Sequence, residues 1–96
     1  MEIIHEEING RGIFYIKDDN GKFAELTYRR TPDNKIVADH TWVSPEREGQ
    51  GIARKLFDKL VEFVRNEKAK LVPLCSYVVR TAEKEKEKLK DILTKL

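Results

Sequence analysis

The sequence predicts a single α+β domain with a mixed, mostly antiparallel sheet and the element order β-β-β-β-α-β-α. Strand-like segments separated by tight-turn residues fill the first half of the chain, a strongly amphipathic helix follows, and a short apolar run comes after it. The chain has 96 residues, which suffices for one hydrophobic core and leaves no room for a second domain. We therefore expect residues 1–96 to form one domain.

Four segments in the first half have the composition of strands and are separated by turns. Asn9 and Gly10, and then residues 18–21, tolerate the positive φ angles of tight hairpins, and residues 31–34 provide a third turn that contains a proline. Strands joined by turns this short pair as antiparallel neighbours. The predicted strands are residues 2–8, 12–17, 23–30 and 35–43.

The fourth predicted strand is partly apolar on both of its faces. A strand of this kind suits the interior of a sheet that is covered on both sides better than an edge. Side chains alternate between the two faces of a strand. We expect one face to carry Ile36, Ala38, His40 and Trp42, and the other to carry Val37, Asp39, Thr41 and Val43.

The second half of the chain predicts a helix, a strand and a further helix. Apolar residues recur every three or four positions from Ile52 to Val64, so a helix should begin near Gly51 and end between residues 66 and 68. Residues 71–75 form a short apolar run, which predicts a fifth strand. The strand–helix–strand order predicts a right-handed crossover. The fifth strand should therefore lie beside the fourth strand and parallel to it. The remaining residues, 77–96, predict a final helix.

Composition and charge exclude several classes of function. The 19 basic and 17 acidic residues give a net charge of +2, which disfavours a dedicated nucleic-acid-binding protein. The single cysteine cannot form an internal disulfide, and no cysteine–histidine set has zinc-site spacing. No apolar run approaches the roughly 20 residues of a membrane span, and the first residues do not resemble a signal peptide. We expect a cytoplasmic protein without a metal, nucleic-acid or membrane partner.

The connection between the fourth strand and the helix, residues 48–54, is the strongest candidate for a ligand site. A helix start offers unpaired N–H groups and the positive end of the helix dipole, which together bind anions. Gly49 and Gly51 let the backbone approach a phosphate closely, and Arg47 and Arg54 add positive charge. The motif lacks the Gly-Lys-Ser/Thr ending of a Walker A loop and the third glycine of a dinucleotide fingerprint. A plain strand-to-helix turn is the alternative interpretation.

Residues 39–56 resemble the strand, acyl-CoA loop and helix of the GNAT superfamily of N-acetyltransferases, and specifically its small single-domain branch. Members of that branch have similar segments to Asp39-His-Thr before the loop and to Cys75-Ser-Tyr77 after the fifth strand. The resemblance implies a GNAT-like fold in which the fourth and fifth strands splay apart, with acetyl-CoA as co-substrate. One position departs from the superfamily pattern, because Glu48 stands where the pattern has Gln or Arg.

The resemblance also implies which residues bind acetyl-CoA. The backbone of the fourth strand would pair with the pantetheine arm, and the loop would hold the pyrophosphate, with Glu48 contributing its N–H. The acceptor would be an amine, such as a protein lysine or N-terminus, and the protein would be a monomer or a weak homodimer. The residues expected to bind acetyl-CoA are Thr41, Trp42, Val43, Glu48, Gly49, Gln50, Gly51, Ile52, Ala53 and Arg54.

Three residues are candidates for the chemistry of acetyl transfer. Cys75 is expected near the thioester, either as a nucleophile that carries the acetyl group or as a small buried apolar residue. His40 is a candidate base, or a half-buried histidine held by a hydrogen bond. Tyr77 is a candidate to protonate the leaving thiolate, or a packing residue at a helix start. Trp42 either lines the cofactor cleft or fills the core.

Two functions are left open by the sequence. The first is an acetyl-CoA-dependent N-acetyltransferase, which the loop in its strand-to-helix context and Cys75 favour. The second is a non-catalytic acyl-CoA-binding or protein-interaction module. The small size of the chain favours the second, because it lacks the helices that help to shape the acceptor site in larger members of the superfamily.

Overall fold

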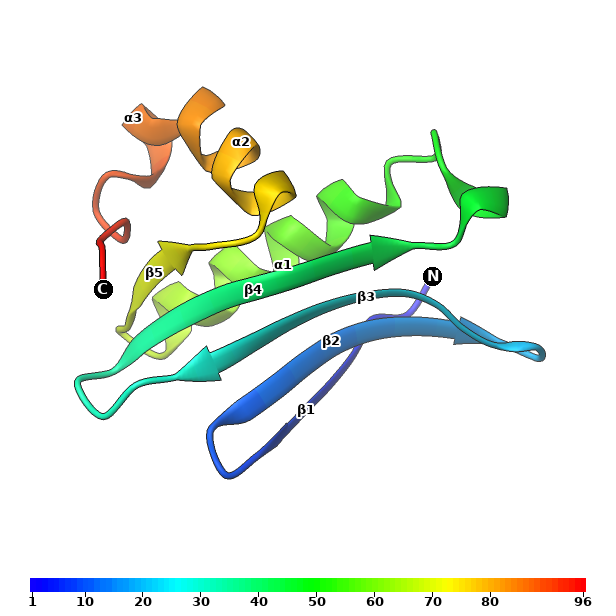
Figure 1. Ribbon diagram of the computed structural model, residues 1–96, viewed down its shortest axis with the longest axis horizontal. Helices are drawn as coiled ribbons and strands as arrows, with labels where there is room; N and C mark the ends of the chain where they lie inside the picture. Colours follow the sequence, from blue (N-terminus) through cyan, green and yellow to red (C-terminus); the bar gives the residue numbers. More distant parts are fainter.

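The computed structural model describes residues 1–96 and contains one five-stranded sheet with three α-helices (Figure 1). The strands lie side by side in chain order; the first four are antiparallel, and β5 is parallel to β4. This confirms the predicted fold class. The strands are β1 (Ile4–Ile8), β2 (Arg11–Asp18), β3 (Gly21–Arg30), β4 (Lys35–Val43) and β5 (Lys70–Pro73).

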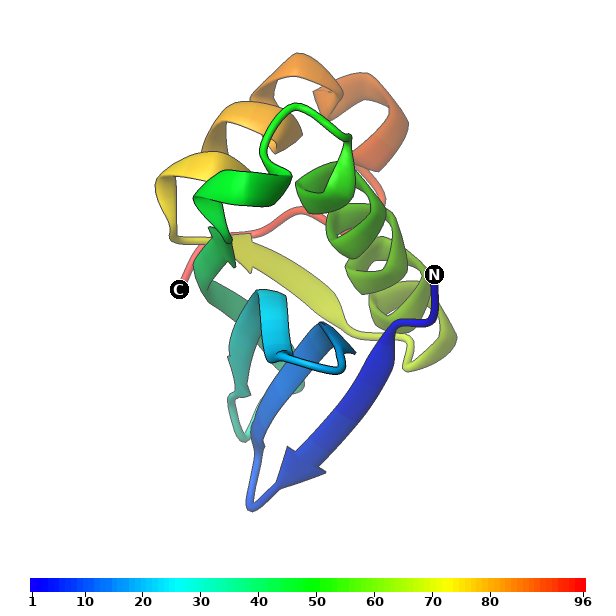
Figure 2. The same ribbon diagram turned by 90° about the vertical axis from the view of Figure 1, so that its right-hand side faces the viewer.

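The helices lie on one side of the twisted sheet and over its β5 edge (Figure 2). The apolar stripe of α1 packs on the sheet, and the core that results is made of fully buried side chains such as Phe14, Leu26, Leu56 and Leu60. None of these helices has both the length and the apolar character that a membrane crossing needs. The helices are α1 (Ile52–Asn66), α2 (Ser76–Lys84) and α3 (Lys86–Leu89), and a short 3₁₀ turn, η1 (Pro45–Arg47), precedes α1.

The opposite face of the sheet carries no helix, and Figure 1 shows β2, β3 and β4 from this side. On β3, the buried Ala24 and Leu26 point toward α1, so the residues between them point away from it. We call this second surface the open face. It carries Tyr15 on β2, Glu25 and Thr27 on β3, and His40 and Trp42 on β4.

The final helix is shorter than the sequence predicts. The single helix expected over residues 77–96 is instead α2 and α3, separated by Glu85 with φ −118° and ψ 26°, and an extended segment follows. In that segment, Leu71 N–H of β5 donates to Ile92 O at 2.7 Å, and Thr94 N–H donates to Leu71 O at 3.0 Å. The prediction was wrong because the last residues pair with the otherwise unpaired edge of β5 instead of continuing the helix. A helical pattern in the sequence does not reveal hydrogen bonds to a distant strand.

A bulge interrupts β4 at Asp39. Thr27 on β3 lies opposite His40, whereas its neighbour Tyr28 lies opposite Ala38, which leaves Asp39 as an extra residue on β4. The Asp39 carboxylate accepts a hydrogen bond from Thr27 Oγ1 at 2.7 Å, which fixes this extra residue in place. An extra residue in one strand moves the side chains that follow it to the other face.

The bulge corrects the predicted faces of β4. Ile36 and Ala38 pack into the core with α1, but His40 and Trp42 do not share their face. The His40 side chain is 52% exposed and Trp42 is 40% exposed, both on the open face, whereas Val43 packs against the core. The prediction was wrong beyond the bulge because simple alternation assumes an unbroken strand.

A polar network holds the edge strand β1 against β3. The Tyr28 hydroxyl donates to Glu7 Oε1 at 2.6 Å and accepts from His5 Nε2 at 2.7 Å. Arg30 donates to both oxygens of the same carboxylate, at 2.9 and 3.0 Å. Arg30 and then Tyr28 lower the pKa of Glu7 to about 2, and burial raises the pKa of Tyr28 well above its usual range. The ionised carboxylate is therefore the form that stabilises this edge of the sheet.

Glu7→Gln is expected to destabilise the protein at neutral pH and to have little effect near pH 2. The folded-state pKa of Glu7 lies below its ordinary value of 4.5, so its contribution is present above about 4.5 and is lost as the pH falls to about 2. Because the residue is partly exposed, we expect a loss of only about 1 kcal/mol in the free energy of unfolding from urea titrations. Glu6→Gln, whose carboxylate accepts only from the exposed Tyr15 hydroxyl, is the control and should change little. An equal loss at both pH values would contradict this assignment.

Candidate active site

β4 and β5 separate beyond Ala38. The parallel pairing ends with Ala38 opposite Pro73. The Ala38 carbonyl oxygen then accepts the N–H groups of both Leu74 and Cys75, at 3.0 and 3.1 Å, as the chain turns away from the sheet. From there to Val43, β4 has no partner on its β5 side, and this space is the gap between the two strands.

The free side of β4 presents backbone groups to this gap. Ser44 N–H donates to Phe23 O of β3 at 2.7 Å, and alternate residues of a strand direct their backbone groups to opposite sides. Thr41 and Val43 therefore direct their N–H and C=O groups away from β3 and into the gap. An extended ligand that carries amide groups can pair with them as a further strand would.

The loop that follows β4 places a run of free N–H groups at the same gap. Gly51, the N-cap residue of α1, is left-handed with φ 72°, and no side chain caps the helix. The first helical amide with a partner is Lys55 N–H, which donates to Gly51 O at 3.2 Å. The six N–H groups of residues 49–54 donate to no acceptor within the chain. Unpaired donors at the positive end of a 15-residue helix form a site for an anion.

Glu48 does not belong to this run of free donors. Its N–H, which was expected to serve the ligand, donates to Pro45 O at 3.4 Å and closes the turn η1. Its side chain is exposed to solvent. The Glu48 N–H is therefore used within the chain in this structure, the free donors begin at Gly49, and ligand binding by Glu48 stays a prediction.

The end of β4, the loop, the first turn of α1 and the start of α2 surround a cavity of ≈ 490 Å³. Nine of the ten residues expected to bind acetyl-CoA line this cavity, and Gln50 is the exception. Arg47 and Tyr77 complete the lining. The structure thus brings together, from three separate elements, most of the residues that the sequence motif singled out.

The two arginines of the cavity are each paired with carboxylates of the chain. Arg47 Nη2 lies 2.5 Å from Asp18 Oδ2. Arg54 donates to Glu85, with Nη2 2.9 Å from Oε1, and to Asp58, with Nε 2.9 Å from Oδ1. The Glu85 contact raises the pKa of Arg54, and Arg54 lowers the pKa of Glu85. Because these carboxylates already balance the arginines, the free N–H groups of the loop are the cavity's main unpaired donors.

The predicted Cys75 and Tyr77 lie at the start of α2, across the gap from β4. Cys75 is not in β5 as predicted, since β5 ends at Pro73 and Cys75 is the N-cap residue of α2. Its Sγ lies 3.3 Å from Thr41 Oγ1, and this contact joins the two sides of the gap. The Tyr77 ring packs edge-on against Phe57, with ring centres 6.5 Å apart, and the Tyr77 side chain faces the cavity.

His40, the third predicted residue, lies on the open face and does not line the cavity. Its Nε2 is 3.2 Å from Glu25 Oε2, and the other oxygen of Glu25 lies 2.8 Å from Lys22 Nζ. The structure therefore places His40 and Cys75 on two sides of the same unpaired segment of β4. Glu25 was not among the predicted site residues.

The sequence from β2 to the segment after α3 matches a known family. The family described as GCN5-related N-acetyl-transferase matches residues 13–92. The chain belongs to this family. Members of the family are acetyltransferases that generally use acetyl-CoA and an acceptor, and membership identifies this GCN5-related protein as an acetyltransferase.

One solved structure supports the same family, and a second, more distant one supports the fold. The NMR structure of a candidate GCN5-like N-acetyltransferase from Staphylococcus aureus is 36% identical, covers 97% of this chain and 89% of its own, and superposes with a TM-score of 0.72. A ribosomal-protein-alanine N-acetyltransferase from Brucella melitensis biovar Abortus 2308 shares the fold, with 20% identity, a TM-score of 0.64, and coverage of 85% of this chain and 62% of its own. No curated protein sequence matches this GCN5-related protein.

Proposed function

We propose that the protein is an acetyl-CoA-dependent N-acetyltransferase that acts on an amine, and that residues 1–96 form one acetyl-CoA-binding domain. The observation that carries this proposal is the gap between β4 and β5, which ends at the six free N–H groups of residues 49–54. The gap suits an extended, amide-containing arm, and the loop suits a pyrophosphate. Pantetheine and pyrophosphate are the corresponding parts of coenzyme A.

The loop also has room for a bulky anion. Gly49 and Gly51 have φ angles of 82° and 72°, and apart from the adjacent residues no atom lies within 4 Å of the position that a Cβ would take at either residue. The space on the side-chain side of these two residues is therefore open. Glycine is required here by the backbone conformation, and it also keeps the approach to the donors open.

The residues around the gap have separate roles in this proposal. Acetyl-CoA supplies an activated acetyl thioester, whose C–S bond breaks as the C–N bond to the amine forms. His40, on the open face, accepts the amine proton, and the Tyr77 hydroxyl in the cavity gives a proton to the departing thiolate. Thr41 holds the Cys75 thiol in the gap. Transfer is direct, and an acetylated Cys75 in the intact mass would instead reveal a covalent path.

A thermal-shift titration tests the proposal. Acetyl-CoA and CoA are expected to raise the melting temperature in a concentration-dependent way, because a ligand that binds only the folded state stabilises it. ADP, which lacks the pantetheine arm, is expected to give a smaller shift. The absence of a shift with both CoA species would refute the proposal. A shift without thiol release, for every amine tried, would favour the binding module over the enzyme.

A further inference from the structure

We propose that the open face carries a site for one primary alkylammonium group, formed by Glu25 together with Tyr15, Trp42 and His40. This inference rests on the proposed function in one respect. The proposed function is what identifies the bound ammonium group as the acceptor amine. The strands place three of these residues in one row across the sheet, because Glu25 of β3 lies opposite Tyr15 of β2 and opposite Trp42 of β4.

A carboxylate between two aromatic side chains is suited to a cation. The Glu25 side chain is 19% exposed, and its Oε2 is 3.2 Å from His40 Nε2. Trp42, beside it, is 40% exposed and so leaves its ring accessible from solvent. Carboxylates pair with ammonium groups through charge-assisted hydrogen bonds, and the faces of aromatic rings attract cations.

The structure shows one ammonium group already in this position. Lys22 Nζ lies 2.8 Å from Glu25 Oε1 and 5.7 Å from the centre of the Tyr15 ring. Lys22 has the same terminal group as any acceptor lysine, so it demonstrates that the site accommodates a primary alkylammonium. Its side chain is 47% exposed, and pairs exposed to this degree are weak, so an incoming amine can displace it.

The site adjoins the segment of β4 that leaves β5. Trp42 lines the cavity as well as the row on the open face, and His40 directly follows the bulge. An amine paired with Glu25 therefore lies on one side of β4, and the free edge of the same strand borders the gap. No helix covers this surface (Figure 1), so an amine on a large molecule can reach it.

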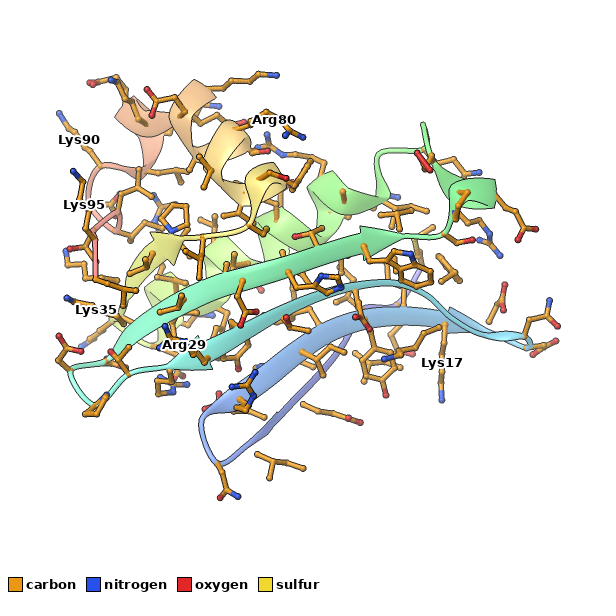
Figure 3. All side chains as sticks on the ribbon, viewed as in Figure 1. Lys17, Arg29, Lys35, Arg80, Lys90 and Lys95 are labelled. Atoms are coloured by element: carbon orange, nitrogen blue, oxygen red, sulfur yellow. The ribbon has the colours of Figure 1, made fainter.

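Two unpaired cations near the row restrict which amines fit. Lys17 and Arg29, both labelled in Figure 3, alternate with buried residues of β2 and β3 and so lie on the open face, on opposite sides of the row. Neither makes an ion pair, so each repels further positive charge. The site should accept a single ammonium with neutral or acidic surroundings, such as one lysine of a peptide, and disfavour a polyamine.

The test is a binding titration without coenzyme, using Nα-acetyl-lysine N-methylamide and following the indole N–H resonance of Trp42, the only tryptophan. The norleucine analogue, which lacks the ammonium, and spermidine are expected to bind more weakly. Lys22→Met should strengthen binding by about five-fold, because it removes the internal competitor, and Glu25→Gln should weaken it about ten-fold. Lys17→Met, which removes an unpaired cation from the same face, is the matched control. Lys17 does not pair with Glu25 and disfavours mainly additional charges, so its loss should change the affinity for the singly charged lysine compound less than about two-fold.

Two results would overturn the inference: equal binding of the lysine and norleucine compounds, or no difference between Lys22→Met and Lys17→Met. The acetyl-CoA thermal shift, measured on the same variants, should persist and shows that they are folded. If the wild-type protein shows the acetyl-CoA shift but does not bind the lysine compound, this site alone is refuted. Absence of the shift in the wild-type protein refutes the proposed function alone, since the amine titration contains no coenzyme.

Discussion

Gly51→Glu is expected to abolish the rise in melting temperature that acetyl-CoA produces, with a loss of affinity of about 100-fold or more. The new side chain would enter open space at the loop that carries the free N–H groups of residues 49–54. Its carboxylate would compete for the donors that the proposed function assigns to the pyrophosphate and would repel the ligand's negative charge. Isothermal titration with acetyl-CoA, together with the thermal shift, measures the loss.

Two controls separate charge from backbone strain. Gly51→Ala keeps the left-handed strain, φ 72°, without adding charge, so it should lower stability by about 1 kcal/mol and retain most of the affinity. Gly10→Glu adds the same charge at a similar angle, φ 78°, in the turn between β1 and β2, and should bind acetyl-CoA normally. If Gly51→Glu bound as well as Gly10→Glu, the loop would not hold the pyrophosphate.

The parts of the fold that follow local rules were predictable from the sequence. β4 has the predicted bounds, Lys35–Val43, and α1, Ile52–Asn66, begins and ends within the predicted limits. The loop could be singled out for the same reason, because left-handed backbone at Gly49 and Gly51 is a local requirement that glycine meets. The family resemblance carried by this segment was then confirmed by the match to residues 13–92.

The parts that depend on distant residues were not predictable in this way. The bulge at Asp39 depends on the pairing of β4 with β3 and on the hydrogen bond from Thr27 to Asp39. No pattern within the sequence of β4 indicates it. The pairing of Arg54 with Glu85 joins residues 31 positions apart. Glu25 is one charged residue of an alternating strand, and only the register with its neighbours shows that two aromatic side chains flank it.

The bulge also determines which side of β4 carries His40. Unbroken alternation would have put His40 on the same face as Ala38, inside the core. With the extra residue, His40 reaches the open face beside Glu25, while Thr41 contacts Cys75 across the gap. In the proposed function, this single inserted residue is what allows one strand to present an amine site on one side and an acyl-donor site at its edge.

Gly12→Ala is expected to cause the largest loss of stability among these substitutions. Gly12 lies opposite Tyr28 in the sheet, and a methyl group on it would lie 2.0 Å from Cζ of the Tyr28 ring. Tyr28 is 1% exposed, and its hydroxyl is hydrogen-bonded to Glu7 and His5. Its ring also packs against Phe63, with 5.3 Å between ring centres, so the ring cannot shift without breaking these contacts. We expect a loss of about 3 kcal/mol or more in the free energy of unfolding, measured by urea denaturation.

A double-mutant cycle with Tyr28→Leu tests whether the ring is the cause. Leucine lacks the Cζ, Cε2 and hydroxyl atoms that lie within 2.3 Å of the added methyl group. The single Tyr28→Leu change should itself be costly, because it leaves the Glu7 carboxylate without its hydroxyl donor. In the Tyr28→Leu background, however, Gly12→Ala should cost less than about 1 kcal/mol, so that the two changes are strongly non-additive. Additive losses would mean that Gly12 is required by the backbone itself and not by the aromatic ring that covers it.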